Sequence, residues 1–216
     1  DNKAIRPTFI LINKIHSIMK YVPSILMVFT LFTIFSFKPL TDKSVIVIDI
    51  GHGGKDMGAV FAGVSEKENV LNVASKIKHL NKNENVEIIL IRESDEFTSL
   101  QDRVDKINSL NPNLLISLHA NQIEKNDVSG VEAFVYGEGD YTEKSNEYAN
   151  DLLEALSNKK INSRGVKDAS FLVLRKVNCP AVTLELGFIT NSSDRKYMTS
   201  KKGQKQIAQN IVELFN

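Results

Sequence analysis

Beyond residue 43, short hydrophobic runs alternate with longer stretches in which apolar residues recur every three to four positions. The short runs are rich in β-branched residues and almost continuously apolar, which is typical of strands covered on both faces. They lie at Val45–Ile50, Val86–Ile91, Leu114–Leu118, Val131–Tyr136 and Ala181–Leu186. The longer stretches have the spacing of amphipathic helices and lie at Glu66–Leu80, Leu100–Leu110, Ser145–Leu156 and Gly203–Phe215. The alternation predicts a three-layer α/β/α domain with a mixed, largely parallel sheet flanked by helices.

The first of these helices is predicted to begin at Glu66. Val73 and Ile77 belong to its apolar face, and Ser65 precedes it. Ser65 with Glu68 three residues later has the pattern of a capping box. This places Glu66 in the first helical turn.

A different pattern precedes residue 44. The segment Tyr21–Phe37 carries no charge, is bracketed by Lys20 and Lys38, and lies at the short end of the roughly 20 residues that a spanning helix needs. Residues 1–39 contain five basic residues and one acidic residue, which fits a signal peptide or a membrane anchor whose N-terminus stays inside. No small-x-small cleavage motif is present near residues 36–39, which favours an uncleaved anchor over a cleaved signal. A buried core helix is the third alternative, but the segment lies outside an otherwise complete domain.

Two domains are therefore expected: a basic segment with a signal or anchor over residues 1–43, and a folded domain over 44–216. The whole chain of 216 residues has a formal net charge of +1, so nothing global indicates nucleic-acid binding. Cys179 is the only cysteine, which excludes an intrachain disulfide and a multi-cysteine zinc site. Any metal must depend on carboxylates and on the four histidines, His16, His52, His79 and His119.

Three of the predicted strands end in residues that can carry chemistry. His52 follows the first strand within a glycine-rich loop, His119 follows the run Leu114–Leu118, and Glu185 lies at the end of the last run. Functional residues of such sheets gather at the carboxyl ends of strands, and Glu66 opens the helix after the first loop. Two imidazoles, one carboxylate and an open position suit catalytic zinc, and a further carboxylate can accept a proton from water.

Each candidate also has a simpler explanation. A single histidine at a strand end is usually a hydrogen-bonded loop residue, and Glu66 alone would be a favourable charge at a helix N-terminus. Glu185 is harder to explain, because an acid within an apolar run is costly to bury without a partner. The loop Gly51–Gly54 could bind phosphate, but it lacks the P-loop Lys-Ser/Thr and the dinucleotide fingerprint. His79 suits the last turn of its helix and His16 precedes the membrane segment, so neither is expected to be a ligand.

Five separated motifs resemble the N-acetylmuramoyl-L-alanine amidases of the Amidase 3 family. They occur in the order typical of that family, and the resemblance extends over roughly Val45 to Phe215. The motifs are VIDIGHGGKDMGA (47–59), SEKENVLNVA (65–74), SLHAN (117–121), SRGVK (163–167) and LELGFITN (184–191). The resemblance implies a mixed sheet of about six strands flanked by helices. It also implies zinc ligation by His52, Glu66 and His119, with Glu185 as the catalytic acid/base.

The implied reaction is hydrolysis of the amide between N-acetylmuramic acid and L-alanine in bacterial peptidoglycan. Asn121 and the backbone amides of Gly53 and Gly54 are expected to orient the substrate. Arg164 is expected either to meet a carboxylate of the stem peptide or to form a structural salt bridge. Two alternatives stay open: a zinc peptidase that cuts within the stem peptide, and a non-catalytic wall-binding module on the same fold.

Such a substrate places the expected site of action outside the cytoplasm, in the periplasm or on the cell-wall side. The protein is expected to be anchored in the cytoplasmic membrane through residues 21–37, or to be secreted after signal cleavage. The sequence identifies no activator protein.

Overall fold

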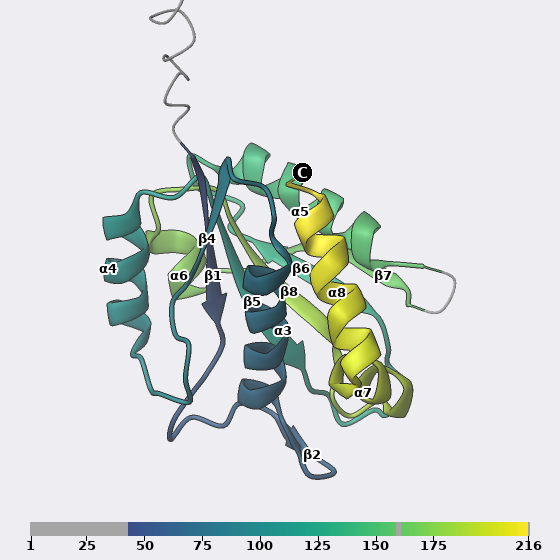
Figure 1. Cartoon of the computed structure of the whole chain (residues 1–216). Coiled ribbons are helices and arrows are strands. Elements are labelled where there is room, and N and C mark those ends of the chain that lie inside the picture. Colours follow the sequence, from purple (N-terminus) through teal and green to yellow (C-terminus); the bar gives the residue numbers. More distant parts are fainter. Residues whose placement is uncertain (1–42, 159–160, 216) are drawn as a thin grey trace, which may run out of the picture. The chain divides into compact units, whose positions relative to one another are not determined.

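The structure, a computed structural model, describes residues 43–158 and 161–215. Six strands form its main sheet: β1 (Ser44–Ile50), β4 (Val86–Leu90), β5 (Leu114–Asn121), β6 (Val131–Val135), β7 (Ser163–Asp168) and β8 (Ala181–Phe188). Their spatial order is β4-β1-β5-β8-β6-β7 (Figure 1). The first four strands in this order are parallel, whereas β6 runs antiparallel to β8 and β7 runs parallel to β6. The predicted mixed, largely parallel sheet of six strands is confirmed.

Helices cover both faces of this sheet. The first face packs against α3 (Glu66–Leu80), α5 (Thr142–Leu156) and α8 (Lys201–Glu213), and the second against α4 (Leu100–Leu110) and α6 (Leu172–Lys176). The strands alternate accordingly: Ile46 and Ile48 of β1 belong to the first core, and Val47 to the second. This double burial explains why the strand sequences are almost continuously hydrophobic.

The structure extends two predicted strands and adds elements that hydrophobic periodicity did not indicate. β5 continues three residues beyond Leu118, so His119 lies inside the strand, and β8 continues past Leu186 to Phe188. The added elements are a small hairpin of β2 (Val60–Phe61) and β3 (Val64–Ser65), together with β7, α6 and α7 (Ser192–Thr199). β7 has no buried residue, so its sequence lacks the alternation of apolar residues by which a strand is predicted.

The predicted capping box at the start of α3 was wrong in its hydrogen bonding. Ser65 occupies the N-cap position, but its side chain accepts no backbone hydrogen bond and its hydroxyl lies 3.5 Å from the Glu68 carboxylate. The first helical amide, that of Glu66, instead donates to the carbonyl of Ala59 at 2.8 Å. Because the preceding loop supplies this acceptor, the serine is not needed as a cap. The expected position of Glu66 in the first turn is confirmed.

Among the helices of residues 43–158 and 161–215, none has the length and apolar character needed to cross a membrane. The predicted anchor Tyr21–Phe37 lies outside the described residues, as does His16.

The topology gathers the candidate residues at one end of the sheet. β1, β5 and β8 are adjacent and parallel, so their carboxyl ends meet at the same edge. The loop after β1 carries His52, β5 carries His119 and β8 carries Glu185, while Glu66 enters from the N-terminus of α3.

Candidate metal centre

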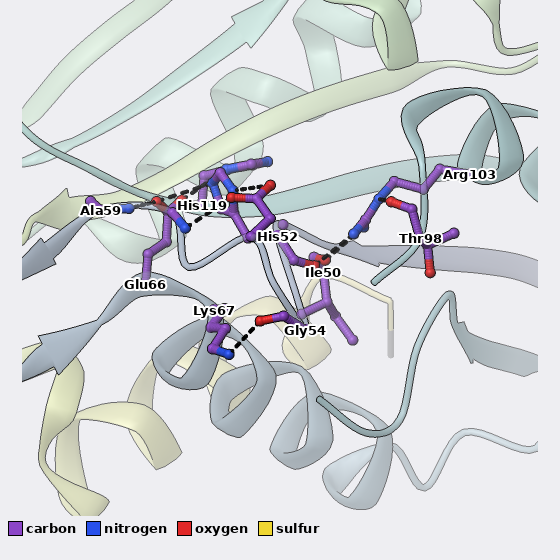
Figure 2. A network of polar contacts seen from close by, with 12 residues as sticks. Ile50, His52, Gly54, Ala59, Glu66, Lys67, Thr98, Arg103 and His119 are labelled. Atoms are coloured by element: carbon purple, nitrogen blue, oxygen red, sulfur yellow. Dashed lines mark hydrogen bonds and ion pairs between the residues drawn. The ribbon is translucent and has the colours of Figure 1, made fainter. Parts of the chain in front are cut away.

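His52, Glu66 and His119 converge on one point. One ligand atom from each lies within 4.8 Å of the others, and the two imidazole rings stand edge to face with centroids 5.1 Å apart. Glu66 lies between them, with Oε2 at 3.1 Å from Nε2 of His52 and Oε1 at 2.9 Å from Nδ1 of His119 (Figure 2). Within the described part of the chain, this is the one cluster of histidine and acidic side chains with the spacing of a metal site.

Backbone amides fix the Glu66 carboxylate. Oε2 accepts from the amide of Ala59 at 2.8 Å, and Oε1 accepts from the amide of Ala120 at 3.0 Å. Burial by itself would raise the pKa of Glu66, but the hydrogen bonds with His119 and His52 outweigh it and hold the pKa well below its usual range. The carboxylate is therefore ionised and its orientation is set before any ligand arrives.

Glycines allow these groups to approach so closely. A Cβ on Gly51 would lie 2.5 Å from the His119 ring, and a Cβ on Gly58 would lie 2.5 Å from Oε2 of Glu66. Both distances are far inside van der Waals contact, so any other residue would displace a side chain of the centre. This gives the glycines of the loop a steric role in the centre.

His52 has a left-handed backbone, with φ of 61°, which costs a non-glycine residue about 1–3 kcal/mol. Buried Arg103 stabilises this conformation, because Nη2 donates to the His52 carbonyl at 2.6 Å and Nη1 to the Ile50 carbonyl at 2.7 Å (Figure 2). Arg103 in turn pairs with buried Asp49 at 2.5 Å. A second buried arginine, Arg92, donates to the carbonyls of Ile50 and Gly51.

Asp56 orients the His52 ring. Its Oδ2 lies 2.9 Å from Nδ1 of His52, which leaves Nε2 directed at Glu66. Such carboxylate–histidine pairs are typical of metal sites, since they fix the tautomer of the ligand. Burial lowers the pKa of His52, but Glu66 and then Asp56 outweigh it and raise the pKa to about 9.

The centre attracts positive charge. For His119, too, burial lowers the pKa, whereas the hydrogen bond to Glu66 and the charge of Glu185 outweigh it and raise the pKa. The raised pKa values of both imidazoles reflect a carboxylate environment that favours positive charge between them. The donor set of two nitrogens and one carboxylate fits zinc, and the groups converge as a bound ion requires.

Glu185 stands directly beside His119. The two residues are paired across the parallel strands β5 and β8, so their side chains lie on the same face of the sheet. Oε2 of Glu185 is buried, and no group in the described residues donates a hydrogen bond to it. Burial, with help from Glu66 and Glu132, raises the pKa of Glu185 to about 7, although His119 and His52 oppose this. A carboxylate with such a pKa can accept and release a proton near neutral pH.

The residues expected to bind substrate divide into two groups. Asn121 and Arg164 both contact buried Glu132, at 2.6 Å and 3.0 Å respectively, so the structural salt bridge considered for Arg164 is present. The amide of Gly53 donates to the Asp56 carbonyl at 2.9 Å, and the amide of Gly54 donates to the Asp95 carboxylate at 2.8 Å. Both glycine amides therefore already have acceptors within the protein.

Four residues that support the site were not predicted from the sequence: Asp56, Asp49, Arg103 and Glu132. Partners for the histidines were to be expected, but local sequence does not say which groups they are. Glu132 did have a signal, because an acid inside the apolar run Val131–Tyr136 is as costly to bury as Glu185.

Comparison with known proteins agrees with this geometry. The model of the family described as N-acetylmuramoyl-L-alanine amidase (Amidase_3) matches residues 46–215. The protein YqiI of Bacillus subtilis, described as uncharacterised, is 37% identical over 177 residues, covering 81% of this chain and 84% of YqiI. The Probable cell wall amidase LytH of Staphylococcus saprophyticus is 35% identical over 184 residues, covering 82% of this chain but 58% of its own length.

A solved structure extends the similarity to three dimensions. The N-acetylmuramoyl-L-alanine amidase from Clostridium difficile 630 superposes with a TM-score of 0.75 at 30% sequence identity, covering 80% of this chain and 94% of that one. The region matched by the family model contains nearly the whole sheet and all four residues of the site. The chain therefore belongs to the N-acetylmuramoyl-L-alanine amidase family.

Proposed function

We propose that this protein hydrolyses the amide that joins the lactyl group of N-acetylmuramic acid to L-alanine in peptidoglycan, as a zinc-dependent enzyme. The observation that carries the proposal is the convergence of His52, Glu66 and His119 beside Glu185, whose buried Oε2 meets no donor within the described part of the chain. Its membership of the amidase family supports the choice of substrate.

The three converging side chains would hold the zinc ion. The chemistry that zinc supplies in such a site is polarisation of a carbonyl and a lowered pKa for water. The protein itself contributes the prearranged charge: Glu66 is fixed by two amides, and Asp56 presents Nε2 of His52 to the centre.

Glu185 would act as the general base and then as the general acid. Its free Oε2 would accept a proton from the attacking water and return that proton to the nitrogen of the departing L-alanine. A pKa of about 7 suits both transfers, because the group is then neither too weak a base nor too weak an acid near neutral pH.

Substrate contacts are proposed for Asn121 and Arg164, which lie near Glu185 through their shared partner Glu132. The loop of Gly53 and Gly54 would contribute through its shape, since both of its amides are bonded within the protein.

Digestion of purified peptidoglycan separates this proposal from its alternatives. An amidase frees intact stem peptides from the glycan and exposes a new L-alanine amine. A peptidase on the same metal would release shortened stems, and a wall-binding module would bind the wall without releasing either product. We expect intact stems, identified by mass spectrometry, and their loss when a chelator removes the metal.

Asp56→Asn is expected to weaken zinc binding about 10–100-fold, the usual effect of removing a carboxylate that orients a ligand histidine. A neutral amide at position 56 cannot accept the Nδ1 proton as strongly as the carboxylate does, so Nε2 of His52 becomes a poorer ligand. Competition with a chromophoric chelator measures the affinity. Asp127→Asn, an exposed control outside the cluster, should keep the affinity of the unaltered protein. Unchanged zinc affinity in Asp56→Asn would contradict the assigned role.

The proposed site of action is outside the cytoplasm, since cell wall is the target of the relatives. We propose further that residues 21–37 anchor the protein in the cytoplasmic membrane, or are cleaved as a signal. N-terminal sequencing of the protein from cells distinguishes the two versions. Protease added outside spheroplasts should degrade the amidase domain, and survival of the domain until lysis would contradict both versions.

A further inference from the structure

A bulge in β7 places two cations on one side of the sheet. The register between β6 and β7 shifts so that Arg164 and Gly165 both lie opposite Glu132. Gly165 has a φ of 79°, a left-handed conformation that suits glycine. In a regular strand Arg164 and Lys167, three positions apart, would point to opposite faces. The extra residue brings both of them to Glu132, which explains the spacing of the motif SRGVK.

Glu132 is the buried anchor of this arrangement, with 2% of its surface exposed. One carboxylate oxygen accepts from Nε of Arg164 at 3.0 Å and from Nζ of Lys167 at 2.5 Å, and the other accepts from Nδ2 of Asn121 at 2.6 Å. Burial raises the pKa of Glu132, but Lys167 and Arg164 outweigh it and lower the pKa, so the group is ionised. One negative charge is thus shared by two positive charges, and the trio retains a net positive charge.

The cations keep donors that Glu132 does not use. The side chains of Arg164 and Lys167 are 35% and 41% exposed. Arg164 bonds through Nε, and among the described residues neither of its terminal nitrogens meets an acceptor. Its guanidinium also lies over the ring of Phe188 at 5.2 Å, which helps to fix its plane. A fixed guanidinium with two free terminal nitrogens suits a carboxylate bound in bidentate fashion.

These cations lie within reach of a substrate held at Glu185. Glu132 and Glu185 are paired across β6 and β8, so both project from the same face. Arg164 starts about 10 Å away, two strand spacings from β8, but its guanidinium reaches back over Phe188 of β8. A carboxylate two residues along the stem peptide lies about 7 Å from the scissile amide. That distance is shorter than two strand spacings, and the Arg164 side chain shortens the gap by extending toward β8.

We propose that Arg164 and Lys167 form a carboxylate subsite for the second residue of the stem peptide, with Glu132 as the positioning residue that holds both cations. The proposal rests on the amidase function proposed above and specifies its substrate class: stems in which this carboxylate is free are preferred to stems in which it is amidated.

A pair of synthetic muramyl peptides tests the subsite in the full chain. The two differ only in whether the second residue carries a free carboxylate or a carboxamide. We expect the unaltered enzyme to cleave the carboxylate substrate with a kcat/KM about tenfold higher, the effect of one charge-assisted hydrogen bond at a half-exposed site. The two substrates should differ in KM and share the same kcat. Arg164→Gln should bring the ratio close to one, and Lys167→Gln should reduce it in part. Arg175→Gln, an exposed arginine on α6 with the same loss of charge, should preserve it.

The variant Glu132→Gln tests whether Glu132 acts by positioning Arg164 and Lys167 or only through the net charge of the site. The substitution removes one negative charge, so the net charge of the site rises by one, but it also frees both cations from their shared carboxylate. If Glu132 positions them, the preference for the carboxylate falls; if net charge alone acts, the preference rises and the positioning role is overturned. The ratio between the two substrates cancels any effect on Glu185 that both substrates share.

The remaining outcomes are also decisive. Equal cleavage of both substrates by the unaltered enzyme, with the same ratio in Arg164→Gln and Lys167→Gln, overturns the subsite and leaves the amidase function standing. Cleavage of neither substrate by zinc-loaded protein overturns both proposals. Should Arg164→Gln fail to fold, as judged by circular dichroism, a preference unaltered in Lys167→Gln overturns the shared subsite.

Discussion

Replacing Glu185 with glutamine is expected to lower kcat about 10²–10⁴-fold while zinc stays bound, because a general base contributes that much to hydrolysis. Glutamine has nearly the same shape, and the three converging ligands do not include position 185. The amide has no proton-accepting oxygen of comparable basicity to replace the free Oε2. Single-turnover rates and metal analysis on the same preparation measure the two properties together.

The pH profile supplies an independent check on the same residue. Glu185 must be deprotonated to accept a proton, and burial raises its pKa to about 7. As pH falls below 7 the protonated fraction grows, so kcat/KM should fall about tenfold per pH unit; above 7 this group should no longer limit the rate. In Glu185→Gln the residual rate should lose this dependence.

Glu87→Gln is a matched control, since Glu87 is an exposed acid on the edge strand β4. It should retain both the rate and the pH profile of the unaltered protein. Near-normal turnover by Glu185→Gln would move the general base to another residue.

The parts of the fold that sequence predicted are those with a strong burial pattern. β1 is buried on both faces and its hydrophobic run is continuous, so both its existence and its end at Ile50 were predicted. β5 ran longer than expected, because its last residues alternate between polar and small side chains and a register irregularity follows His119. β7 escaped prediction, since a strand exposed along its length has no apolar period.

The residues of the site likewise divide into those that the sequence predicted and those that it did not. His52, His119 and Glu185 were predicted because each ends or follows a hydrophobic run, and parallel strands bring such positions together. Asp56 and Arg103 were not, because their contacts with His52 depend on its left-handed backbone, which no local pattern encodes. The side-chain partners of a loop become visible only once the loop has a shape.

Glu132 is an instructive intermediate case. An acid within an apolar strand is costly to bury, and the same argument had singled out Glu185 as a candidate. What separates the two residues is their environment: Glu132 is neutralised by two cations, whereas Oε2 of Glu185 has no hydrogen-bond donor among the described residues. The first arrangement holds a charge in place, and the second leaves a proton acceptor free.

Replacing His119 with alanine is expected to abolish stoichiometric zinc binding and, with it, hydrolysis. The substitution removes the imidazole that supplies one of the three converging ligand atoms, and leaves Oε1 of Glu66 bonded to the Ala120 amide alone. Protein zinc sites bind with about 10–16 kcal/mol in total, so the loss of one ligand costs on the order of 3 kcal/mol, or at least about 100-fold in affinity.

His79→Ala is the matched control for this experiment. His79 lies exposed in the last turn of α3, outside the converging cluster, and was not expected to be a ligand. Inductively coupled plasma mass spectrometry after dialysis should find about one zinc per chain in His79→Ala and close to none in His119→Ala, with unchanged circular dichroism in both. One tightly bound zinc in His119→Ala would remove His119 from the ligand set. Loss of zinc from His79→Ala would instead place the metal away from the sheet edge, because His79 is separated from Glu66 and its two histidine partners by the length of α3.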